Sequence, residues 1–107
     1  MRFDAFETSL DLVRSLRGPL TALETRDGSL ATQVRRAAAS VSLNLAEGRR
    51  RAGRDRLHLW RVAAGSADEV RAALRVAEAC GYLEAADIEA ALGFVDRVLA
   101  MLWRLTR

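Results

Sequence analysis

Five polar residues spaced three or four positions apart are the first candidate for chemistry in this chain. Gln33, Arg36, Ser40, Asn44 and Glu47 would form one row along a helix, beside an apolar face. A serine in such a row becomes a nucleophile only when a base such as histidine activates it. The row contains no such base, and we therefore predict no catalytic residue.

The same row is suited to hydrogen bonding between helices. Residues 63–65, Ala-Ala-Gly, have little side-chain bulk, and a mid-helix Gly65 suggests that a second helix approaches closely there. Since polar groups withdrawn from water have to be paired, we predict a structural network that fixes the register of two helices. Its members are Gln33, Arg36, Ser40, Asn44, Glu47, Ser66 and Glu69. A ligand-binding cleft is the alternative, which the missing nucleophile–base pair disfavours.

Clustered arginines are the second candidate. Residues 29–61 hold eight arginines against two acidic residues, a local charge of +6 in a chain whose formal charge is +3. Such a cluster either binds the phosphate backbone of nucleic acid or is a solvated surface with internal salt bridges, and both interpretations stay open. The residues proposed to bind nucleic acid are Arg35, Arg49, Arg50, Arg51, Arg54 and Arg56. Trp60 is the one aromatic residue among them, so a base-stacking platform is not predicted.

Other chemistry finds little support. One cysteine, Cys80, cannot form an internal disulfide, and with the single His58 it offers no metal-ligand cluster, so we predict no metal and no cofactor. No apolar run is long enough to cross a bilayer and the N-terminal residues lack a signal-peptide pattern, which predicts a cytoplasmic protein without membrane contact.

Helices are needed to position these residues. Twenty alanines and a single proline favour helix throughout, and the apolar spacing predicts an all-α, antiparallel up-and-down four-helix bundle in one domain, residues 1–107. The predicted helices cover residues 3–17, 29–48, 54–80 and 85–105. Gly18-Pro19 is expected to end the first helix and open a loop, and Ser29 is expected to cap the second.

The apolar surface of the first and last helices exceeds what a small core needs. In the last helix it covers more than half of the circumference, which indicates contact with another subunit. Leu12, Leu16, Phe94, Met101 and Trp103 are the predicted interface residues. We therefore expect a homo-oligomer.

The order of these motifs resembles a known family. Gln33, Arg36-Ala37-Ala38, Ser40-Val41 and Asn44-Leu45-Ala46-Glu47-Gly48, followed by Ala63, Gly65-Ser66, Glu69 and Gly81-Tyr82-Leu83, are similar to a bacterial four-helix-bundle family first noticed as reading frames in intervening sequences of 23S ribosomal RNA genes. The resemblance implies a ring-like homopentamer. A related branch comprises the accessory proteins of diversity-generating retroelements, which implies RNA and a reverse transcriptase as possible partners. Helix 3–17 is less typical, with leucines where aromatic residues are common.

Together these features predict a non-enzymatic, homo-oligomeric bundle. Its arginine-rich region between residues 29 and 61 would bind RNA or DNA backbone. The alternative is an oligomeric scaffold for another protein, with no role in nucleic-acid binding.

Overall fold

The chain folds into helices joined by short turns. A computed structural model describes residues 2–107, and within them there are helices and no strand. The helices are α1 (Asp4–Ser15), α2 (Arg17–Arg26), α3 (Gly28–Arg49), α4 (Gly53–Ala79) and α5 (Ala85–Thr106). The all-α prediction is confirmed, but the described residues form five helices where four were predicted.

The additional helix, α2, replaces the predicted loop after Gly18-Pro19. Pro19 has no N–H to donate to the carbonyl of Ser15, four residues earlier, and its ring crowds that carbonyl. Accordingly α1 ends at Ser15. Leu16 keeps helical angles (φ −87°, ψ −8°), and its carbonyl accepts a hydrogen bond from the Leu20 N–H at 2.8 Å. Pro19 thus lies in the first turn of α2, where the absence of an N–H does no harm.

The helix ends explain the remaining boundaries. Asp27, rather than the predicted Ser29, caps α3: its side chain accepts a hydrogen bond from the Leu30 N–H at 3.0 Å. Gly81, with φ +77°, follows the end of α4, where the Tyr82 N–H donates to the Ala77 carbonyl in a Schellman-type cap.

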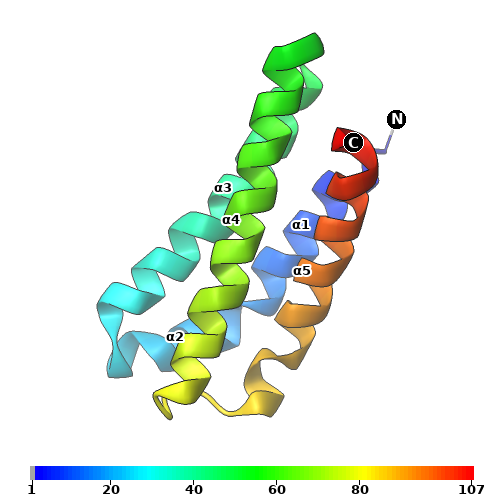
Figure 1. Ribbon diagram of the computed structural model, residues 1–107. Coiled ribbons are helices and arrows are strands. Elements are labelled where there is room, and N and C mark those ends of the chain that lie inside the picture. Colours follow the sequence, from blue (N-terminus) through cyan, green and yellow to red (C-terminus); the bar gives the residue numbers. More distant parts are fainter. Residues whose placement is uncertain (1) are drawn as a thin grey trace.

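The molecule is elongated, with principal extents of 42 × 21 × 21 Å. Figure 1 shows α3 and α4 side by side as a long hairpin, and α1 and α5 beside each other next to it. The turn between α3 and α4 (green) projects beyond both chain ends, while α2 crosses the opposite end. We call residues 49–56 at this turn the hairpin tip.

One core runs along the axis. Each helix contributes fully buried aliphatic side chains, among them Leu12, Leu23, Val41, Leu74 and Leu102. In α1 and at the following Leu16, the residues that point into the core are Ala5, Leu12 and Leu16, whereas Val13 is exposed.

The close backbone approach occurs at Gly48 instead of Gly65. A Cβ at Gly65 would meet no atom within 4 Å, whereas one at Gly48 would lie 2.5 Å from Nε1 of Trp60. Trp60 covers the backbone here and donates a hydrogen bond from Nε1 to the carbonyl of Leu45 at 3.2 Å. Periodicity alone did not reveal that Gly48 makes room for an indole ring.

Candidate nucleic-acid interface

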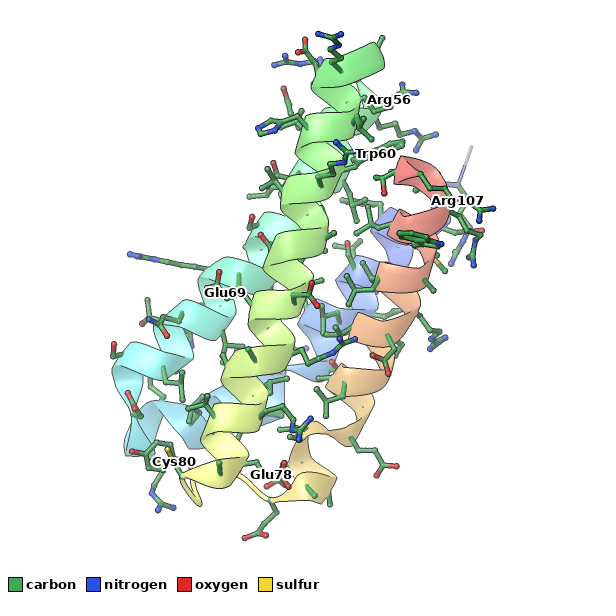
Figure 2. All side chains as sticks on the ribbon, viewed as in Figure 1. Arg56, Trp60, Glu69, Glu78, Cys80 and Arg107 are labelled. Atoms are coloured by element: carbon green, nitrogen blue, oxygen red, sulfur yellow. The ribbon has the colours of Figure 1, made fainter. Side chains whose placement is uncertain are left out.

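The hairpin tip carries most of the predicted arginines, but they have different roles. Arg56 donates from Nε to the Gly48 carbonyl at 3.1 Å and from Nη2 to the Arg49 carbonyl at 3.0 Å. Its guanidinium also lies 5.2 Å from the centre of the Trp60 ring. The Gly48 carbonyl also accepts from the Arg51 N–H at 3.0 Å. Because both carbonyls lie at the end of α3, where the helical hydrogen-bond ladder stops, Arg56 is a side-chain cap of α3. Figure 2 shows Arg56 and Trp60 on α4 at the projecting end of the molecule.

Arg49 is exposed, and its side chain reaches the start of the chain. Its guanidinium is 5.1 Å from the centre of the Phe3 ring, and Phe3 in turn lies 5.7 Å from Trp60, centre to centre. Arginine stacked on an aromatic face contributes about 0.5–1 kcal/mol at an exposed site. Arg49 therefore helps to attach the start of the chain to the hairpin.

Two further candidates form ion pairs. Arg51 contacts Glu47 at 2.8 Å, one helical turn away, and Arg35 contacts Glu24 of α2 at 3.2 Å. All four side chains are about half exposed. A phosphate would have to compete with these carboxylates, although exposed ion pairs are weak, at about 0–1 kcal/mol.

Arg50 and Arg54 differ from the others. Both are exposed, and neither makes an ion pair or a side-chain hydrogen bond with another residue in the part of the chain that the structure describes. Arg61, two turns beyond Arg54 on α4, is exposed in the same way. These three exposed arginines near the tip have guanidinium groups without a partner among residues 2–107.

The predicted polar network is present in a smaller form. The hydroxyls of Ser40 and Ser66 lie 2.8 Å apart and join α3 to α4. Asn44 donates from Nδ2 to the Ser40 carbonyl at 2.9 Å and to its hydroxyl at 3.0 Å. The hydroxyl and the carbonyl of Ser40 are thus both engaged in structural hydrogen bonds.

The other predicted members lie outside this group. Glu47 pairs with Arg51. Gln33, Arg36 and Glu69 are exposed, and no side-chain hydrogen bond joins them to a residue within 2–107. Helical spacing placed them near the row, but their side chains point past the contact between α3 and α4 into water.

A second hydroxyl pair was not predicted. Ser9 of α1 and Ser42 of α3 are buried, and their hydroxyls lie 2.8 Å apart. Ser9 also donates to the Phe6 carbonyl at 2.6 Å. On a helical wheel of α1, Ser9 lies next to the core residue Leu12. This position was the one feature of the sequence that could have predicted that Ser9 is buried.

The predicted interface residues do not share one surface. Leu12 and Leu16 are fully buried within the single chain, which corrects their assignment to a subunit contact. Phe94 and Met101 are half-buried, while Trp103 is 65% exposed. Trp103 is two positions from Met101, about 200° around the helix, so these two side chains leave α5 on different sides.

Neither a metal centre nor a membrane span emerges. Residues 2–107 contain no group of three or more His, Cys, Asp or Glu side chains that could hold a metal ion. Among the described helices, none combines the length and apolar character needed to cross a bilayer.

The fold and the site are those of a small helical protein in which the hairpin of α3 and α4 extends beyond the ends of α1 and α5 and carries arginines at its turn. The chain belongs to the 23S rRNA-intervening sequence protein family, whose model matches residues 2–104. The suspected resemblance is thereby confirmed. No protein with a curated description matches the chain.

A solved structure shares the fold. It is a protein of unknown function from the S23 ribosomal protein family of Bacteroides thetaiotaomicron VPI-5482. The alignment covers 96% of this chain and 98% of that one, with a TM-score of 0.85 and 18% sequence identity. At this identity the similarity establishes the shared arrangement of helices.

Proposed function

We propose that this protein is a non-enzymatic nucleic-acid-binding protein that contacts the phosphate backbone through its hairpin tip. Arg50 and Arg54 carry the proposal, because they are exposed and have no acidic partner within residues 2–107. They belong to the hairpin tip, whose turn extends beyond the chain ends (Figure 1). Arg51 would add a contact after exchanging its carboxylate for phosphate. Arg35, which pairs with Glu24 of α2, lies about 20 Å along α3 from the tip and is outside this surface. Arg49 and Arg56 stabilise the tip through their contacts with Phe3 and with the end of α3.

Backbone contact of this kind is largely independent of sequence. Each neutralised phosphate releases condensed counterions, so the logarithm of the binding constant falls by roughly 0.7–0.9 per phosphate for each unit increase in the logarithm of the salt concentration. Two to four contacts would give a shallow but measurable slope. We also propose that the protein is cytoplasmic.

The test compares two double variants of equal charge. Arg50→Ala/Arg54→Ala removes the tip charges, whereas Arg17→Ala/Arg75→Ala removes two exposed arginines elsewhere. Fluorescence anisotropy with labelled RNA and DNA at low salt should show a loss of affinity and a reduced salt slope for the first variant only. Equal losses of affinity in the two double variants would mean that binding depends on net charge and not on the hairpin tip. No binding by the wild-type protein at low salt would refute the proposal.

We further propose that the five helices act as a four-helix bundle with a first helix interrupted at Leu16, and that copies of it associate, as in a homopentamer. Phe94 and Met101 on α5 and Phe6 on α1 are half-buried, and these two helices pack against each other, which supports association through this side. A ring of copies would repeat the basic tip around an axis and strengthen weak single contacts.

A further inference from the structure

The exposed indole of Trp103 is the most unusual surface feature of the chain. It is 65% exposed, whereas the other tryptophan, Trp60, is 7% exposed. A tryptophan left largely in water forgoes much of the free energy that burial of its large apolar surface provides. The residues around the Trp103 ring therefore indicate what kind of ligand could bind over it.

The register of α4 and α5 identifies those surroundings. Arg71 of α4 donates a hydrogen bond to Asp96 of α5, which fixes the two antiparallel helices against each other. Seven residues further along α5 lies Trp103, and seven residues back along α4 lies Ala64. Counted from this hydrogen bond at 1.5 Å per residue on both helices, Trp103 lies near the level of Ala64, whose methyl group is too small to cover an indole ring. The next residue, Gly65, has open space where a side chain would project.

Positive charge adjoins this ring. Arg107 follows Trp103 by one helical turn, and Arg61 precedes Ala64 by about one turn, so both lie on the side of Trp103 nearer the hairpin tip. Both are exposed, and the structure pairs neither with a carboxylate in the chain from residue 2 onward. Figure 2 shows Arg107 at the same end of the molecule as Trp60 and Arg56.

These positions continue the surface of the hairpin tip. Arg54 and Arg61 are seven residues apart on one face of α4, a rise of about 10 Å. Arginines therefore lead from the tip down α4 to an open aromatic ring. Phosphates along a strand could follow the arginines while a base stacks on the indole.

We propose that Trp103, with Arg61 and Arg107, is a base-stacking site that makes the protein prefer single-stranded over duplex nucleic acid. The proposal rests on the function proposed above and specifies its ligand. Proteins that bind single strands combine a basic track with aromatic side chains on which bases stack. In a duplex the bases are already stacked on one another, so Trp103 gains nothing from it.

The experiment uses a 15-nucleotide single-stranded RNA of mixed sequence and the duplex of that sequence. Binding to wild type, Trp103→Ala and Leu43→Ala is followed by anisotropy and by tryptophan fluorescence. Leu43 is the matched control, because it is 68% exposed on α3. Since Trp60 and Trp103 are the only tryptophans, quenching that Trp103→Ala abolishes reports on Trp103.

Trp103→Ala should weaken single-strand binding about 5- to 150-fold and leave duplex binding within about twofold, with Leu43→Ala unchanged for both probes. Two results would overturn the stacking site and leave the proposed function standing. In the first, Trp103→Ala weakens binding to the single strand and to the duplex equally. In the second, Trp103→Ala has no effect while Arg50→Ala/Arg54→Ala still weakens binding. A wild-type protein that binds neither probe would refute both. If Trp103→Ala instead converts an oligomer into a smaller species with unchanged binding, Trp103 is a subunit contact and the inference fails.

Discussion

At Gly48 an indole ring lies where any other residue would carry a side chain. A Cβ there would come within 2.6 Å of both Nε1 and Cδ1 of Trp60, a ring that is buried and hydrogen-bonded to Leu45. Gly48→Ala should therefore destabilise the protein by about 1–3 kcal/mol through overpacking, measured by urea unfolding. Gly65→Ala is the control, and at its open helical position it should stabilise by up to about 1 kcal/mol. Equal effects of the two substitutions would contradict this account.

The buried pair of Ser9 and Ser42 allows a second prediction. Removing either hydroxyl leaves the other without its partner, at a cost of about 1–3 kcal/mol. Ser9→Ala/Ser42→Ala should cost less than the sum of the single variants, because no hydroxyl is then stranded. Additive losses in the double-mutant cycle would show that the 2.8 Å contact is energetically unimportant.

Some of the residues that form hydrogen bonds between helices could be predicted from the sequence and others could not, and the reason is physical. Ser40, Asn44 and Ser66 were recognised because they share a helical row and small neighbours. Trp60 over Gly48 and Ser9 beside Ser42 depend on which helices become neighbours and at what height. One sequence does not contain that information in its spacing.

Among the elements, the C-terminal end of α3 depends on a side chain from α4. Arg56 donates to the carbonyls of Gly48 and Arg49, so Arg56→Ala should loosen the turn that presents Arg50 and Arg54. We expect faster amide hydrogen exchange across residues 50–56 and a loss of about 1–3 kcal/mol in stability, as for a hydrogen bond to a charged group.

Arg54→Ala removes the same charge without touching these carbonyls and serves as the control. It should leave amide exchange in the turn unchanged. Equally fast exchange in both variants would mean that charge, and not the cap, holds the turn.

The division between α1 and α2 shows why element boundaries are difficult to predict. The sequence predicted that Gly18-Pro19 ends a helix, yet the interruption falls at Leu16, three residues before Pro19, and the helix then resumes. Pro19 has no N–H to donate to the carbonyl of Ser15. Gly18 keeps ordinary helical geometry and does not act as a left-handed cap. Packing of Leu23 in the core stabilises α2, and this tertiary contact outweighs the local signal.

For the whole molecule, self-association can be tested through the side shared by α1 and α5. Phe94→Glu would place a charge within the proposed contact and should lower the mass measured by light scattering at micromolar concentrations. Leu43→Glu introduces the same charge on an exposed part of α3 and should leave the mass unchanged. A wild-type protein that is monomeric under these conditions would contradict the association.

The overall arrangement was more predictable than its details. All-helical structure followed from composition and from apolar periodicity, because burial of one face per helix is a strong requirement. The accessible part of the site did not follow, since ion pairs such as Arg35–Glu24 and the cap at Arg56 form only after α2, α3 and α4 come together.

The two ends of α4 also differ in electrical sign. Residues 49–61 contain six arginines and one acidic residue, whereas residues 76–89, around the opposite turn, contain four acidic residues and no basic one. One arginine from α2, Arg26, lies over the Tyr82 ring at this turn. With the hairpin tip projecting, this separation gives the long axis an electric moment. In the field of a polyanion the molecule would rotate so that the tip arrives first, and the acidic turn would be repelled. Salt would then act on the rate of encounter as well as on the lifetime of the complex.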